Sequence, residues 1–162
     1  MASLRSHARI PRTADDVWAV IARPERISEW FPGMVSATVE GDVRTITLRT
    51  GIPLVEEIVN VDHHLRRFQY RVTGPLPMRY HLGTVDVIDD TRDPAEPACL
   101  LVYSTQVEPD PIAFVFDGAI SDAVENLARL LTDGSLEILP LDPPGPAPRA
   151  TTATTAPTAP QG

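Results

Sequence analysis

Residues 14–34, "ADDVWAVIARPERISEWFPGM", contain two helix signals in succession, and the strands predicted below lie on either side of them. The first signal begins at Thr13, which lies three residues before Asp16 and can cap a helix by accepting a backbone hydrogen bond. Val17 and Ile21 are four residues apart, so they share one helical face. This half of the stretch predicts a short amphipathic helix.

The second half of the stretch predicts another short helix. Pro24 suits the first turn of a helix, and Ile27, Trp30 and Phe31 share one apolar side at spacings of three and four. Residues 32–33, Pro-Gly, end the helix. Two large aromatic side chains at a helix end suit either the mouth of a binding site or an anchor in the core, and the stretch itself leaves both open.

On both sides of this stretch, apolar and polar residues alternate with a period of two, which is typical of strands with one polar face. Short turns join most of them, so an antiparallel meander is expected. The strands are predicted in "LRSHARIP" (4–11), "VRTITLRT" (43–50), "PLVEEIVNV" (53–61), "RRFQYRV" (66–72), "MRYHLGTVDVIDD" (78–90) and "CLLVYSTQVEP" (99–109).

A long amphipathic helix is predicted over residues 110–131, "DPIAFVFDGAISDAVENLARLL". Asp110 can cap it, Pro111 suits its first turn, and Gly134 is a plausible stop. The apolar residues of the helix recur at helical spacing: Phe116, Ile120, Val124 (or Ala123), Leu127 and Leu131. A strand, two short helices, several strands and a long helix make an α+β fold.

The chain of 162 residues carries a formal net charge of −8, which argues against binding to nucleic acid or to anionic membranes. No apolar run is long enough to span a bilayer, so membrane insertion is not expected. The first ten residues lack the apolar region of a secretory signal, which favours a cytoplasmic location.

Composition also limits the chemistry. All 14 basic residues are Arg, so Schiff-base catalysis and pyridoxal attachment through a lysine are excluded. The single Cys99 cannot form an internal disulfide or a thiolate cluster. The adjacent His63 and His64 diverge on extended backbone and have no second cluster beside them, so no metal site is expected. No glycine-rich phosphate loop is present, and no cofactor is expected.

From residue 140 the composition changes to Pro, Ala and Thr with almost no bulky apolar side chain. Such a segment buries too little surface to offset the entropy of ordering. We therefore expect a folded domain over residues 1–139 and a disordered tail over residues 140–162.

In the order and spacing of its motifs the chain resembles the START-like superfamily with the Bet v 1-type helix-grip fold, and within it the polyketide cyclase/dehydrase and lipid-transport branch. The motifs are the opening stretch, "VRTITLRTG" with "VEEI", "RRFQYRVTGPLPMRYH" and the closing helix, which together cover roughly residues 3–131. The resemblance implies a curved seven-stranded antiparallel sheet that grips the C-terminal helix. It also implies a deep, mostly apolar cavity between them, with the two short helices at its mouth.

Glu56 is a candidate acid-base residue. It is adjacent to Glu57 in a strand, so the two side chains point to opposite faces, and the resemblance places Glu56 inside. A carboxyl group in an apolar cavity has a raised pKa, which suits proton transfer. A cross-strand ion pair with Arg44 or Arg49 explains the residue equally well.

His81 is the second candidate acid-base residue, because the resemblance points its side chain inward and a His moves protons near neutral pH. A hydrogen-bonded His or one aimed at a ligand is the simpler interpretation. Tyr80 then faces outward, unless the register slips by one.

Several aromatic side chains are candidates for contact with a ligand, although core packing or a structural hydrogen bond accounts for each nearly as well. Of Trp30 and Phe31, one ring is expected on the ligand and the other in the core, with the Trp30 indole favoured for the ligand. The candidates are Trp30, Phe31, Phe68, Tyr70, Tyr103, Phe114 and Phe116.

Two functions of different classes follow. In the first, the protein binds a hydrophobic small molecule, a lipid or an aromatic polyketide-like compound, as a monomer or homodimer. In the second, the same cavity is a polyketide cyclase or dehydratase in which Glu56 and His81 move protons. A regulatory sensor that uses the cavity is a third interpretation. Binding is favoured, since the polar groups are scattered rather than gathered as catalysis requires.

Overall fold

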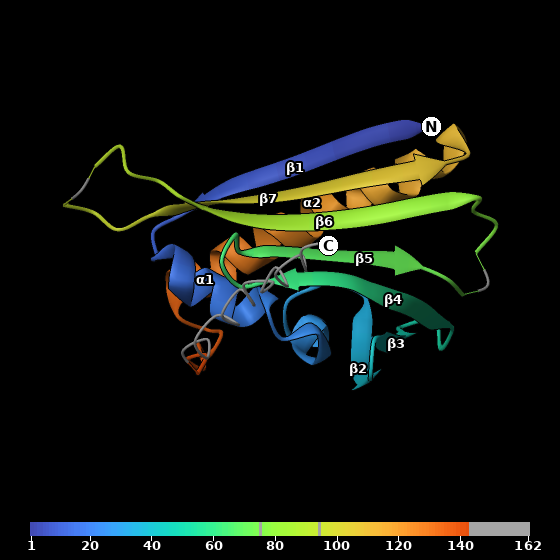
Figure 1. Cartoon of the computed structure of the whole chain (residues 1–162), viewed down its shortest axis with the longest axis horizontal. Coiled ribbons are helices and arrows are strands. Elements are labelled where there is room, and N and C mark those ends of the chain that lie inside the picture. The colour runs from blue at the N-terminus through green and yellow to red at the C-terminus, as the bar shows by residue number, and fades with distance from the viewer. Residues whose placement is uncertain (75, 94, 143–162) are drawn as a thin grey trace, which may run out of the picture.

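The computed structural model describes residues 1–74, 76–93 and 95–142. It contains seven strands, two α-helices and two short 3-10 helices in these residues (Figure 1). Their bounds are β1 Ala2–Ile10, α1 Ala14–Ile21, η1 Pro24–Glu29, β2 Met34–Glu40, β3 Val43–Leu48, β4 Pro53–Asp62, β5 Arg67–Val72, β6 Tyr80–Asp89, β7 Cys99–Glu108, η2 Asp110–Ile112 and α2 Ala113–Asp133.

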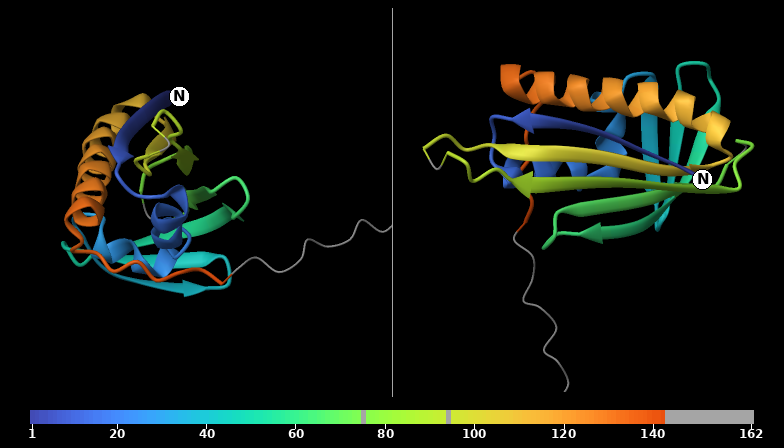
Figure 2. Two further views of the ribbon diagram at one scale, coloured as in Figure 1. Left: turned by 90° about the vertical axis from the view of Figure 1, so that its left-hand side faces the viewer. Right: turned by 90° about the horizontal axis from the view of Figure 1, so that it is seen from above.

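The seven strands form one antiparallel sheet in the order β1-β7-β6-β5-β4-β3-β2. The sheet curves, and α2 lies along its concave side (Figure 2). The expected α+β helix-grip architecture is confirmed. The alternation of residues did not predict strand β2, which followed only from the seven strands that the resemblance implied. β2 is an edge strand with a bulge between Met34 and Ser36, which weakens its alternation.

Helix α2 packs mainly on β1 and β7. Apart from one residue in its first turn, its buried side chains lie in the C-terminal two thirds: Ala113, Ile120, Ala123, Val124, Leu127 and Leu131. Gly134 ends the helix in the left-handed conformation, with φ 76°. The sequence predicted that Asp110 caps α2, and this prediction is wrong because the chain first makes the turn η2. The Asp110 carboxylate instead lies 2.7 Å from the Met1 amine.

The two short helices close one end of the grip. Thr13 caps α1 by accepting a hydrogen bond from the Asp16 amide at 3.1 Å, as predicted. Helix η1 packs on β2, and Asn126 of α2 donates to the Trp30 carbonyl at 2.8 Å. This bond fastens the end of η1 to the C-terminal half of α2.

The segment that follows α2 returns along α1 and η1. The Arg23 guanidinium donates to the carbonyl of Pro140 at 2.9 Å, and Arg26 donates to that of Glu137 at 3.0 Å. The segment is described as far as Asp142. The predicted disordered tail lies outside the described residues from position 143 onward and stays a prediction.

Candidate functional site

An apolar cleft of about 540 Å³ opens between the N-terminal half of α2 and the β3–β4 hairpin. The loop after η1 and the loop between β5 and β6 form its two ends. Its lining is almost entirely apolar, with Glu56 and Tyr70 at the floor. The lining residues are Phe31, Pro32, Gly33, Met34, Leu48, Arg49, Thr50, Leu54, Glu56, Tyr70, Leu76, Pro77, Ile112, Val115, Phe116, Ala119 and Ile120.

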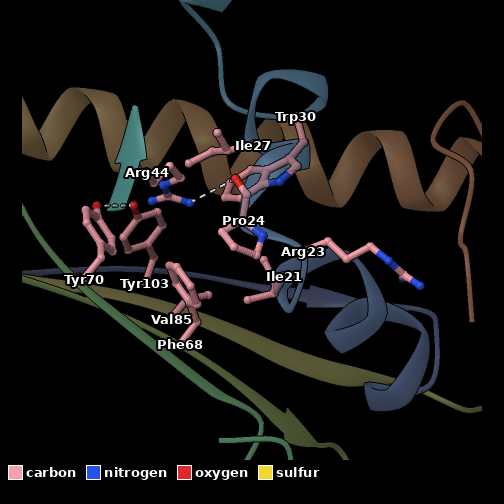
Figure 3. A pocket seen from close by; sticks show the side chains of 10 residues that line it. All are labelled: Ile21, Arg23, Pro24, Ile27, Trp30, Arg44, Phe68, Tyr70, Val85 and Tyr103. Atoms are coloured by element: carbon pink, nitrogen blue, oxygen red, sulfur yellow. Dashed lines mark hydrogen bonds between the residues drawn. The ribbon is translucent and has the colours of Figure 1, made fainter. Parts of the chain in front are cut away.

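Next to η1 the interior is filled by side chains. The pocket that remains there has a volume of about 10 Å³, roughly the room of one water molecule. Figure 3 shows Arg44 reaching toward the Pro24 carbonyl, with Tyr70 and Tyr103 side by side on the other side of the guanidinium and their hydroxyls joined by a hydrogen bond. The resemblance implied a deep cavity, but these large side chains fill the end next to η1. The open space that remains is the cleft at the other end.

The floor of the cleft is an ion pair between opposite residues of β3 and β4, Arg44 and Glu56. Each side chain is only 2% exposed. Arg44 Nε donates to Glu56 Oε2 at 2.7 Å, and Nη2 lies 2.6 Å from the same oxygen, at an angle too oblique for a second hydrogen bond. Of the two ion-pair partners that the sequence left open for Glu56, the register selects Arg44.

Burial raises the pKa of the Glu56 carboxyl above its usual value, and the adjacent Arg44 charge opposes the rise. The guanidinium carbon of Arg44 lies 5.1 Å from the ring centres of both Phe68 and Tyr70, so the cation also rests on two aromatic faces. The pair is thus part of a packed cluster rather than a free acid in a hollow.

Two phenols lie beside this pair. The hydroxyls of Tyr70 and Tyr103 are 2.5 Å apart and hydrogen-bonded, and burial raises the pKa of both phenols. Tyr70 lies across Gly83 of β6, where a Cβ would overlap ring atoms Cε1 and Cζ. The glycine therefore makes room for the Tyr70 ring.

His81 is 3% exposed and faces the interior, as the resemblance implied. The β5–β6 ladder ends at the pair Tyr70 and Gly83, and beyond it the Val72 amide donates to His81 Nδ1 at 3.1 Å. Because Nδ1 accepts, the proton of the neutral ring is on Nε2. Burial lowers the pKa of His81 to about 4, so the ring is neutral near pH 7.

His81 does not line the cleft, because the Phe116 ring covers it. The two ring centres are 4.9 Å apart, and Phe116 itself lines the cleft. The structure thus separates the two candidate acid-base residues: Glu56 reaches the cleft and His81 lies behind an aromatic side chain.

The candidate aromatic residues fall into three groups. Phe31, Tyr70 and Phe116 line the cleft, whereas Phe68 and Tyr103 lie in the filled interior beside it. Trp30 and Phe114 differ from their expected positions. Trp30 is 5% exposed and lines the small interior pocket, whereas the adjacent Phe31 faces the cleft, so the two rings have exchanged their expected places. Phe114 is 85% exposed and points away from the cleft.

Most of the apolar cleft residues were not among the candidates, including Leu48, Leu54, Leu76 and Val115. The first two occupy inward positions on either side of the β3–β4 turn, and strand alternation with a correct pairing register would have indicated them. Leu76 lies in a loop and Val115 in the first turn of α2, where no periodic pattern indicates which side chains face the cleft.

The histidine pair in the β4–β5 turn has a structural use. His63 Nδ1 accepts a hydrogen bond from the Trp18 indole at 3.2 Å. In the described part of the chain, no three His, Cys, Asp or Glu side chains lie together as a metal ion would require.

A curved antiparallel sheet wrapped around a C-terminal helix, with an apolar cleft between them, defines the class of helix-grip proteins with the Bet v 1-like fold. The family described as polyketide cyclase / dehydrase and lipid transport matches residues 1–136, and the chain belongs to this family.

Solved structures share the fold at low sequence identity. The protein XoxI from Bacillus cereus is 21% identical with a TM-score of 0.76, over 85% of this chain and 100% of that one. A Thermobifida fusca protein is 25% identical with a TM-score of 0.66, over 79% of this chain and 91% of that one. Norcoclaurine synthase from Thalictrum flavum, solved with dopamine and hydroxybenzaldehyde, is 18% identical with a TM-score of 0.62, over 84% and 89%.

A search of curated proteins finds no match to the sequence. Within the described ranges, none of the helices has both the length and the apolar character that a membrane-crossing helix needs.

Proposed function

We propose that this chain binds a hydrophobic small molecule, a lipid or an aromatic polyketide-like compound, in the cleft between α2 and the β3–β4 hairpin. Family and fold indicate a helix-grip protein that binds a hydrophobic ligand. The observation that carries the proposal is the cleft itself, about 540 Å³ with an almost wholly apolar lining. That volume lies within the usual range for small-molecule sites.

The size of the cleft sets the affinity that burial can supply. A ligand with two fused aromatic rings that buries about 200 Å² of apolar surface gains about 5 kcal/mol at 25 cal/mol per Å². Burial of apolar surface thus supplies most of the binding free energy, so the polar groups at the floor determine the orientation of the ligand more than its affinity.

Native mass spectrometry of freshly purified protein tests the proposal, because a ligand acquired during expression adds its mass to the chain. Ala119→Trp fills the cleft wall and should abolish the added mass. Asp122→Trp places the same side chain on the exposed face of α2, outside the cleft, and should keep it. An added mass that survives Ala119→Trp would place the ligand elsewhere.

One observation favours catalysis as a second function, since Glu56 brings a carboxyl group with a raised pKa to the floor of the cleft. A cyclase or dehydratase would use it to move a proton, with His81 as the second group once Phe116 turns aside. Glu56→Gln should then lower turnover of an aromatic polyketone by orders of magnitude with the ligand still bound. An unchanged rate would leave binding as the function.

A further inference from the structure

Four buried side-chain atoms have no hydrogen-bond partner among the residues that the structure describes, and two of them belong to the ion-paired guanidiniums of Arg26 and Arg44. The other two, His81 Nε2 and Thr105 Oγ1, belong to uncharged side chains on the inner face of the sheet. We call them the inner polar pair. Their residues are 3% and 0% exposed. An unpartnered polar group in an apolar interior costs about 1–3 kcal/mol, so a folded protein rarely retains one without a use for it.

The two side chains lie on the same part of the inner face. The β6–β7 register places Thr105 opposite Gly83 and His81 opposite Val107. Because side chains alternate along a strand, the inner polar pair are diagonal neighbours on the concave face, on either side of the β6 glycine. Both therefore face the space under the N-terminal half of α2.

Phe116 separates His81 from the cleft. Its ring lines the cleft on one side and stacks on the imidazole on the other, with the ring centres 4.9 Å apart and the planes at 35°. Phe116 is itself partly exposed, so its side chain can change rotamer without breaking the core. An outward turn of the ring uncovers the imidazole toward the cleft, and this is the conformational change that the inference requires.

The hydrogen-bonding capacity of the pair defines the group that fits it. His81 Nδ1 is used by the Val72 amide, so Nε2–H is a donor, and the Thr105 hydroxyl can donate as well. The cation of this cluster, Arg44, rests on the Tyr70 ring beside His81 but is already paired with Glu56. The two donors therefore suit an uncharged oxygen acceptor, whereas a carboxylate would lose its hydration without a counter-ion of its own.

Resting on the proposed function, we propose that the ligand places an uncharged carbonyl or hydroxyl oxygen on His81 Nε2–H and Thr105 Oγ1, behind the Phe116 ring. The inner polar pair then reads the polar end of a ligand whose apolar body fills the cleft. The inference thus narrows the ligand class from hydrophobic molecules in general to those with an uncharged oxygen at the buried end.

Three probes of one size test the inference by displacement of a fluorescent dye from the full chain. They are 2-acetylnaphthalene, 2-isopropenylnaphthalene, in which CH₂ replaces the carbonyl oxygen, and 2-naphthoate. The ketone should bind about tenfold more tightly than the hydrocarbon, as one or two hydrogen bonds supply, and more tightly than the carboxylate. Failure of all three to bind would refute the proposed function, while equal binding of ketone and hydrocarbon would refute only the inference.

Thr105→Val is the decisive variant, because it removes the hydroxyl at nearly constant shape. It should erase most of the preference for the ketone and leave binding of the hydrocarbon unchanged. In the free protein it should raise the Tm by about 3 °C, since an unpartnered polar group is removed. A lower Tm would show that the hydroxyl already makes a stabilising contact and would overturn the inference.

His81→Asn tests the other member of the pair. The Asn side-chain oxygen can still accept from the Val72 amide, but the Nε2–H donor is lost. This single variant should likewise erase most of the roughly tenfold preference for the ketone. A preference that persists in both variants would place the ligand oxygen elsewhere.

Discussion

Replacing Arg44 by Met removes the cation from the buried pair at the cleft floor and leaves Glu56 without a counter-ion. Both side chains are 2% exposed, and both close contacts of the guanidinium are to one carboxylate oxygen. Leaving one member of such a pair buried and unpaired costs about 3–5 kcal/mol. We expect a loss of that size in the free energy of unfolding at pH 8.

The loss should depend on pH with an unusual sign. Burial already raises the pKa of Glu56, and removal of the Arg44 charge raises it further. The folded variant then binds a proton that the unfolded chain, with a Glu pKa near 4.3, does not bind. Stability therefore recovers as the pH falls, by up to about 1.4 kcal/mol per pH unit, until the unfolded carboxyl also protonates.

Urea unfolding followed by tryptophan fluorescence at pH 8, 7, 6 and 5 measures both effects, as the difference between the variant and the parent protein. Arg67→Met is the matched control, because it breaks a half-exposed pair with Asp86 whose oxygen lies 2.7 Å away. That change should cost about 1 kcal/mol or less. A cost below about 1 kcal/mol for Arg44→Met, or one independent of pH, would refute the reasoning.

Three further predictions concern other buried positions. The pKa of His81 is lowered to about 4, so the unfolded chain takes up the proton first and acidification from pH 6.5 to 4 should lower the free energy of unfolding by about 3 kcal/mol. His81→Asn should remove that pH dependence in urea titrations. Gly83→Ala forces a Cβ into an aromatic ring and should cost about 3 kcal/mol, whereas Gly118→Ala, in open space on a helix, should gain about 1 kcal/mol; a shared sign in thermal melts would contradict the packing. Trp30 and Phe31 are both buried, so Trp30→Ala and Phe31→Ala should each destabilise by about 3–5 kcal/mol, but only Phe31→Ala should also weaken ligand retention in native mass spectra; retention lost only in Trp30→Ala would exchange the roles assigned to the two rings.

Strand and helix patterns were readable wherever one face is buried and the other is wet. Residues 67–72 alternate polar and apolar side chains, two of them aromatic, so β5 was evident. In β2 the inward positions carry small or half-exposed side chains and Val35 is 60% exposed, so the edge strand had no such contrast.

The candidate site was less predictable, because it depends on register and helix phase. Whether Glu56 meets Arg44 or Arg49 is decided by which residue lies directly opposite it, and a sequence of alternating residues does not specify pairing. Similarly, the backbone leaves the helical path at Trp30, and this determines that Phe31 rather than Trp30 faces the cleft. Phe114 and Phe116 are two residues apart on α2 and lie about 200° apart around its axis, so only one of them can face the cleft.

The uneven anchoring of α2 has a consequence for how this framework changes over evolutionary time. From Ile120 onward the helix is fixed by buried side chains, whereas residues 114–119 are exposed or half-buried. Amide hydrogens of those early turns should exchange with solvent faster than those beyond Ile120. Substitutions there can reshape the entrance of the cleft while the buried contacts from Ile120 onward stay intact, so the set of accepted ligands can change at little cost in the free energy of unfolding.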